Sequence, residues 1–134
     1  MASYRLRCGP VGDFLRPSGL VLDANALMMP FQFRMNLDKE LIRLFGEVPV
    51  YVPSSVLGEL ANSMDKNAPA ALALARKYQI VETELSGDDA VLEIASMRSC
   101  AVVTNDREFI RTLREHRIPV VRLRGERYLV ADDF

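Results

Sequence analysis

The sequence predicts a single α/β domain in three layers, with a central parallel sheet of about five strands between two layers of helices. Short apolar runs alternate with longer stretches whose apolar residues recur at helical spacing, which is typical of this class. A chain of 134 residues with 49% hydrophobic residues can build one sizeable core but has no room for a second domain. We expect the domain to span residues 19–134, preceded by a loose segment at residues 1–18 that contains several turn formers.

The first predicted strand covers residues 20–22 and ends at Asp23. A loop through Met29 and Pro30 is expected to follow and to lead to a helix that opens near Asn36, because asparagine is a favourable helix cap. The residues after this cap place apolar side chains on one helical face, namely Leu37, Leu41, Leu44 and Phe45.

The second strand is expected at residues 49–52, directly before another helix. Ser54 or Ser55 is expected to cap this helix, and Glu59 projects from its second turn. Its inner face is predicted to carry Val56, Leu57, Leu60, Ala61 and Met64.

The remaining elements continue the same alternation. Pro69 fits the first turn of an alanine-rich helix, and Asn105 is expected to cap the last helix, with Glu108 in capping-box position. These elements are a helix at 70–78, a strand at 79–82, a helix opening at 86–89, a strand at 101–104, a helix at 106–116 and a strand at 119–123.

Composition excludes several functional classes. Cys8 and Cys100 are too few and too distant for a disulfide framework or a cysteine metal site, and we expect Cys100 in the core. The only histidine, His116, leaves little material for zinc sites or for Ser-His-Asp chemistry. No apolar run is long enough to span a bilayer and the N-terminus lacks a secretory signal, so we expect a cytoplasmic protein without a membrane partner.

Positive charge is concentrated near the C-terminus, although the net charge is −1. Residues 98–127 contain eight arginines and four acids, a local charge of +4. Such a region suits a phosphate backbone, but a solvated helix face beside a polar edge strand gives the same pattern, and both interpretations stay open.

Four acids follow the predicted strands: Asp23, Glu59, Asp88 and Asp106. Because the carboxyl ends of parallel strands meet at one edge of a sheet, we expect these side chains to converge. Clustered carboxylates repel one another and require a cation, and oxygen ligands without nearby histidine or cysteine favour Mg²⁺ or Mn²⁺. The bound cation would activate a water and stabilise the departing oxygen, which predicts phosphodiester hydrolysis.

Each acid alone also has a purely structural interpretation, as a turn residue, a surface charge or a favourable first-turn acid. Their joint placement at corresponding strand ends favours the metal site. Asp89 is an alternative to Asp88, but if Ser86 caps the helix, Asp89 can bond back to the Ser86 amide and leave Asp88 to face the site.

The strand ending in Asp-x-Asn, the acid in the helix after the second strand, the SGDDAVLEIA helix start and the VVTND strand end resemble PIN-domain nucleases over residues 20–123. The runs LVLDANALMMPFQF and PVYVPSSVLGEL resemble archaeal PIN proteins related to eukaryotic small-subunit rRNA-processing nucleases. VapC-type toxins are less similar. The resemblance implies an endoribonuclease that uses Mg²⁺ or Mn²⁺, cuts single-stranded RNA to leave a 5′-phosphate, and often forms a homodimer.

By this resemblance Asp23, Glu59, Asp88 and Asp106 form a catalytic, metal-binding acidic quartet. Asn25 and Thr104 fall where the family has polar side chains that orient carboxylates or water, and Asn105 has a weaker claim to that role. Arg107 and Arg111 follow Asp106 closely enough to contact RNA phosphates, although surface solubility explains them equally well.

Several functions remain open at this point. The nuclease is expected to act in rRNA processing on a ribosomal precursor particle, in RNA decay, or as a toxin with an antitoxin partner, whereas a non-catalytic RNA-binding or assembly module would keep only the fold. A phosphatase of the haloacid-dehalogenase type is disfavoured, because Asn25 replaces its second aspartate and no lysine follows Asp88.

Overall fold

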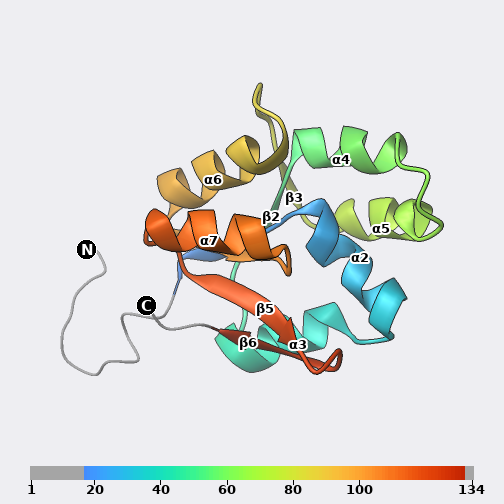
Figure 1. Cartoon of the computed structure of the whole chain (residues 1–134), viewed down its shortest axis with the longest axis horizontal. Coiled ribbons are helices and arrows are strands. Elements are labelled where there is room, and N and C mark those ends of the chain that lie inside the picture. Colours follow the sequence, from blue (N-terminus) through green and yellow to red (C-terminus); the bar gives the residue numbers. More distant parts are fainter. Residues whose placement is uncertain (1–16, 132–134) are drawn as a thin grey trace.

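A six-stranded sheet forms the centre of the molecule in the computed structural model, which describes residues 17–131 (Figure 1). The strands lie in the order β3-β2-β1-β4-β5-β6, and neighbouring pairs are parallel except β5 and β6. They are β1 (Gly19–Leu22), β2 (Val50–Pro53), β3 (Gln79–Val81), β4 (Cys100–Val103), β5 (Val120–Arg124) and β6 (Tyr128–Ala131). The first strand begins at Gly19, and residues 1–16, most of the expected loose N-terminal segment, lie outside the described part of the chain.

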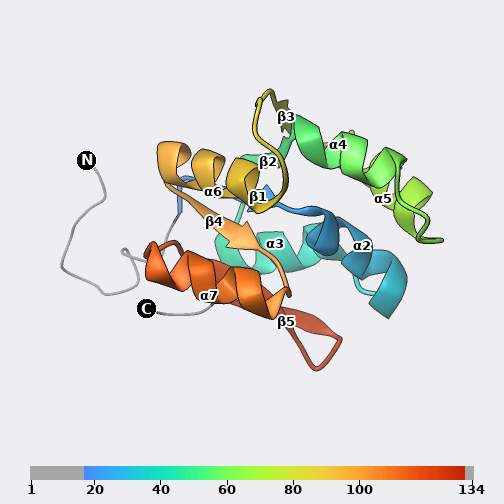
Figure 2. The same ribbon diagram turned by 45° about the horizontal axis from the view of Figure 1, so that its top comes forward.

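Helices cover both faces of this sheet, as the predicted three-layer fold requires (Figure 2). Because successive strand residues point to opposite faces, β1 contributes Leu20 and Leu22 to one apolar core and Val21 to the other. The first core packs against α2 (Ala24–Phe33), α3 (Leu37–Phe45), α4 (Ser54–Ala61) and α5 (Ala68–Ala75), and the second against α6 (Gly87–Arg98) and α7 (Arg107–Glu115). Cys100 is buried in the second core, as expected.

The expected loop after β1 is wrong, because the chain forms helix α2 there with Pro30 inside it. Asp23 caps this helix by accepting a hydrogen bond from the Ala26 amide. Burial of Leu27 and Met29 then outweighs the cost of one interior proline. The predicted cap of α3 is confirmed, since Asn36 accepts a hydrogen bond from the Lys39 amide.

Helix α4 differs from the prediction at both ends. Neither serine caps it: Pro53 occupies the cap position, and the Ser54 hydroxyl instead bonds the backbone of Thr83 after β3. The helix ends at Ala61, so Met64 lies beyond it and is 98% exposed rather than buried.

The C-terminal hairpin was not expected from the sequence. Gly125 and Glu126 both adopt positive φ, and the Arg127 amide donates to the Arg124 carbonyl, which makes a tight turn between β5 and β6. The outer edge of β6 is covered by α3, since Arg43 donates to the Leu129 carbonyl and Glu40 accepts from the Leu129 amide.

Candidate active site at the carboxyl ends of the strands

The first and fourth strands are neighbours, but the helices that follow them cover opposite faces of the sheet. The loops after β1 and β4 therefore diverge, and such a point in an α/β sheet is where ligands bind. Figures 1 and 2 show that the starts of α2, α4, α6 and α7 gather at this edge. Helix starts carry partial positive charge, so the edge favours carboxylates and phosphates.

Asp23 and Asp106 are linked through the buried hydroxyl of Thr104. The Thr104 hydroxyl donates to Asp23 Oδ2 at 2.6 Å and accepts from the Asp106 amide at 3.2 Å. Asp23 Oδ1 accepts from the Ala26 amide at 2.8 Å. Thr104 is fully buried and Asp23 is 9% exposed, so these bonds fix the Asp23 carboxyl between the starts of two helices.

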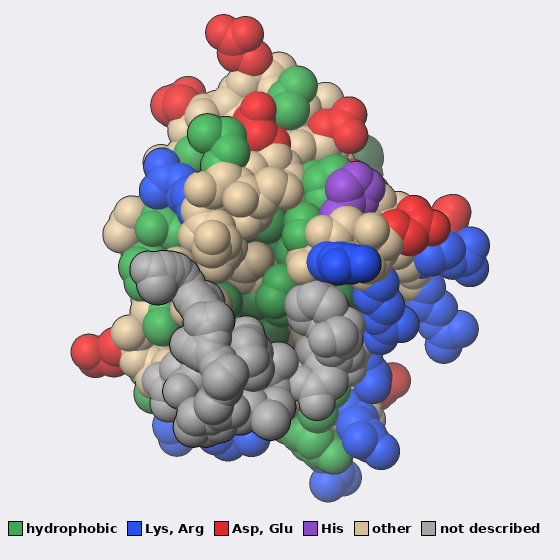
Figure 3. Space-filling model, turned by 90° about the vertical axis from the view of Figure 1, so that its left-hand side faces the viewer, with side chains coloured by type: hydrophobic (Ala, Val, Ile, Leu, Met, Phe, Trp, Pro, Cys, Tyr) green, Lys and Arg blue, Asp and Glu red, His purple; other side chains and the backbone are tan. Residues whose placement is uncertain are grey.

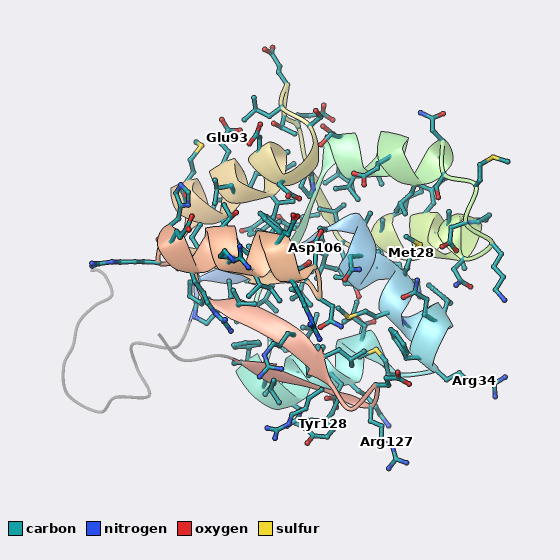
Figure 4. All side chains as sticks on the ribbon, in the orientation of Figure 1. Met28, Arg34, Glu93, Asp106, Arg127 and Tyr128 are labelled. Atoms are coloured by element: carbon teal, nitrogen blue, oxygen red, sulfur yellow. The ribbon has the colours of Figure 1, made fainter. Side chains whose placement is uncertain are left out.

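Two asparagines tie the same loops together. The Asn105 amide donates to Asn25 Oδ1 at 2.9 Å, and Asn105 Oδ1 accepts from the Leu123 amide of β5 at 3.2 Å. The prediction that Asn105 caps α7 is therefore wrong. Asp106 caps it instead, through bonds from the amides of Glu108 and Phe109 to its Oδ1 atom. Figure 4 shows Asp106 at the start of α7, facing the start of α2.

Burial and mutual repulsion alter the acidity of this group. Burial raises the pKa of Asp23 from 3.8 to about 7, the hydrogen bonds from Thr104 and Ala26 partly oppose this, and the charges of Asp88 and Asp106 add to it. Partial burial also raises the pKa of Asp88, with the charges of Asp106 and Asp89 as further causes.

Glu59 joins the same group through Asp88. Partial burial raises the pKa of Glu59, and the charge of Asp88 raises it further. Asp88 thus interacts electrostatically with Asp23, Glu59 and Asp106, so acids from four separate segments of the chain influence one another.

Ser86 occupies the cap position of α6 without a side-chain cap bond, so the expected capping box with Asp89 does not form.

The donor set matches a hard divalent cation in its chemistry, because all four predicted ligands are carboxylates and Asp23 is a buried one. The four carboxylates are more widely spaced than the ligands of a single metal ion. Within residues 17–131, no three His, Cys, Asp or Glu side chains stand close enough together to hold one metal ion. Ligation of one ion by three of these acids would therefore require the exposed ones to move inward.

Sequence reasoning missed two residues near these acids. The charge of Glu108, considered only as a capping-box partner, also raises the pKa of Asp88. The buried Ser55 hydroxyl has no hydrogen-bond partner within the described residues. Ser55 lies four positions before Glu59 and therefore on the same side of α4.

A family model described as "PIN like domain" matches residues 20–126, a range that contains all four acids. The chain belongs to the PIN-like domain family. No helix in the described part of this PIN-like domain is long and apolar enough to cross a membrane.

Two curated relatives of this PIN-like domain carry the name of VapC ribonucleases. Ribonuclease VapC9 of Archaeoglobus fulgidus is 32% identical over 114 residues, which cover 80% of this chain and 84% of that protein. Ribonuclease VapC4 of Methanocaldococcus jannaschii is 31% identical over 121 residues, which cover 81% of this chain and 92% of that protein. The solved structure of the PIN domain endonuclease Utp24 superimposes with a TM-score of 0.75. The match covers 88% of this chain and 93% of the Utp24 chain. At 17% identity, that likeness shows the shared fold.

Proposed function

We propose that this PIN-like domain is an endoribonuclease that hydrolyses RNA phosphodiester bonds with one or two bound Mg²⁺ or Mn²⁺ ions. The observation that carries the proposal is the buried Thr104 bridge between Asp23 and Asp106 at the topological switch point. Glu59 and Asp88, from two further segments, add to this pair through charge. The ribonuclease names of two relatives support the same activity.

In this proposal the four acids hold the cation, with Asp88 rather than Asp89 as the ligand from α6. Asp88 is favoured because its charge raises the pKa of both Asp23 and Glu59, whereas the charge of Asp89 raises only the pKa of Asp88. When bound, the cation lowers the pKa of a water and stabilises negative charge on the departing oxygen.

The surrounding residues of the chain position this group. The Thr104 hydroxyl holds Asp23 Oδ2 and the Asp106 amide, so it sets the separation of the two acids. Asn25 fixes the backbone of Asn105 and with it the loop that carries Asp106. The starts of α2, α4, α6 and α7 favour binding of the scissile phosphate at this edge.

Cleavage of a labelled single-stranded RNA with Mg²⁺ or Mn²⁺ tests this function. We expect cleavage that stops with EDTA, leaves a 5′-phosphate, and is lost in Asp106→Asn, whose amide oxygen still caps α7. Glu47→Gln removes an exposed carboxylate outside the acid group and should leave cleavage unchanged. RNA binding without cleavage under any of these conditions would instead support a non-catalytic RNA-binding or assembly module.

The similarity to two VapC ribonucleases favours a toxin role, with an antitoxin and a second copy of the chain as partners in the cytoplasm. The resemblance of LVLDANALMMPFQF to rRNA-processing PIN proteins favours the alternative, maturation of rRNA in a precursor particle. Growth arrest that requires Asp106 and is relieved by a neighbouring gene product supports the first. Lengthened rRNA precursor ends in a deletion strain support the second.

A further inference from the structure

A groove of about 700 Å³ runs between α7 and β5. Four of its six lining residues are arginines: the lining consists of Arg107, Ile110, Arg111, Arg114, Glu115 and Arg122. With one glutamate against four arginines, the lining carries a net charge of +3 in a chain whose net charge is −1. Figure 3 shows Lys and Arg side chains gathered along one side of the molecule, beside the single histidine, which ends α7.

The positions of these arginines follow from the local structure. Arg107, Arg111 and Arg114 recur at intervals of four and three, so they lie on one side of α7 and span about 10 Å along its axis. Arg122 lies between Val121 and Leu123, which point into the first core, so its own side chain points to the opposite face, towards α7.

The arginine row of the groove begins next to one of the four acids. Arg107 directly follows Asp106, the N-cap of α7, and both Arg107 and Arg111 are exposed. The arginine row therefore starts beside Asp106 at the N-terminus of α7 and continues along the helix towards its C-terminus. A chain with a phosphate at the acids would meet these guanidinium groups at successive positions.

We infer that this groove binds the sugar-phosphate backbone of the RNA on one side of the bond that is cut, an inference that rests on the proposed ribonuclease function. Guanidinium groups match phosphate oxygens with two parallel hydrogen bonds, and such contacts hold the strand without reading its sequence. An acidic protein segment would also be attracted. The backbone is favoured because the arginine row starts next to Asp106, one of the acids at which a phosphodiester has to lie.

The test measures how RNA binding depends on salt. Association of a fluorescent oligouridylate is followed by anisotropy in EDTA, so that binding is separated from cleavage. Each neutralised phosphate contributes about 0.7 to the slope of log K against log salt for a single strand. We expect Arg111→Gln to reduce the steepness by about 0.7, and Arg107→Gln with Arg111→Gln by about 1.4.

Two further variants control for effects other than charge in the groove. Arg76→Gln removes an exposed arginine at the end of α5, outside the groove, and should keep the full slope. Arg111→Lys keeps the charge and should also retain it. An equal loss of slope in Arg111→Lys and Arg111→Gln would overturn a charge contact. Equal thermal midpoints would show that all variants remain folded.

The outcomes separate this inference from the function on which it rests. If the wild type cleaves RNA but the slope is the same in Arg111→Gln, the groove inference is wrong and the nuclease stands. If the slope falls as expected but no RNA is cut with Mg²⁺ or Mn²⁺, the groove is supported and the nuclease proposal fails. Binding of polyglutamate that depends on Arg111, with an unchanged RNA slope, would assign an acidic protein instead and overturn the inference.

Discussion

Asp23 and Asp106 are tied to each other through Thr104, whereas Glu59 and Asp88 are exposed and act on the other acids through charge. The first pair follows the ends of two adjacent parallel strands, β1 and β4, whose register brings these ends together. The second pair stands on helices α4 and α6, on opposite faces of the sheet. One half of the site is thus fixed by hydrogen bonds, and the other, the charge-coupled half, is linked to it within the described residues by charge alone.

The largest expected effect concerns the stability of the fixed half without divalent cations. The pKa of Asp23 is about 7 when folded and 3.8 in the reference state, so the folded protein keeps a proton that the unfolded chain releases. Stability is therefore full below about pH 4, falls as pH rises to about 7, and is constant above. At about 1.4 kcal/mol per pKa unit, the loss is on the order of 4 kcal/mol.

Urea unfolding in EDTA at pH 5 and pH 8 measures the part of this loss that falls between these pH values, on the order of 3 kcal/mol. Asp23→Asn keeps the helix cap and removes the ionisation, so we expect it to lose most of the pH dependence. The raised pKa values of Glu59 and Asp88 should leave a smaller dependence of the same sign. A wild type that gains stability between these pH values would contradict the expectation.

The second effect concerns the link between the two fixed acids. Thr104→Val keeps the shape but removes both hydrogen bonds of a buried hydroxyl, at a cost of about 1 to 3 kcal/mol in the free energy of unfolding. Misplacement of Asp23 should lower kcat by about 10-fold to 100-fold. Because the Thr104 bond lowers the pKa of Asp23, the rising limb of the pH–rate profile should also move to higher pH.

Thr112→Val is the matched control, since Thr112 bonds within α7. It should change neither kcat nor the pH–rate profile. If Thr104→Val lowered stability with an unchanged profile, Thr104 would be a structural residue and not one that positions Asp23.

The third effect tests whether the charge-coupled half contributes to activity without contributing to stability. Glu59 is exposed, so Glu59→Gln should change the free energy of unfolding by less than about 0.5 kcal/mol. Loss of a ligand should still lower kcat by at least about 10-fold. Unfolding in urea and cleavage rates over a range of Mn²⁺ concentrations measure both. Full activity in Glu59→Gln at limiting Mn²⁺ would remove Glu59 from the site.

The same comparison explains which parts could be predicted from the sequence. The alternation of apolar runs predicts parallel strands, and parallel strands place Asp23 and Asp106 at one edge without further information. The Thr104–Asp23 bond joins residues 81 positions apart, and no local pattern reports it. Asn105 and Asp106 are both good caps, so only the path of the chain towards Leu123 decides which one caps α7.

Two failures have a different physical cause. Pro30 predicts a break, but burial of α2 against the sheet and α5 outweighs it. The β5–β6 hairpin is formed by the positive φ of Gly125 and Glu126 and by the contacts of Glu40 and Arg43 with Leu129. The glycine was a local signal for the turn, whereas the cover from α3 depends on tertiary structure.

The smallest expected effect decides between the two acids at the start of α6. The charge of Asp88 raises the pKa of Asp23 and of Glu59, while the charge of Asp89 raises only the pKa of its neighbour Asp88. We expect Asp88→Asn to lower kcat by at least about 10-fold, and Asp89→Asn by no more than about 2-fold. Both substitutions remove one first-turn charge from the same helix, so their effects on helix stability should match within about 0.5 kcal/mol. If cleavage rates showed the reverse order, Asp89 would be the ligand, and the charge-coupled half would face the fixed acids from a different side of α6.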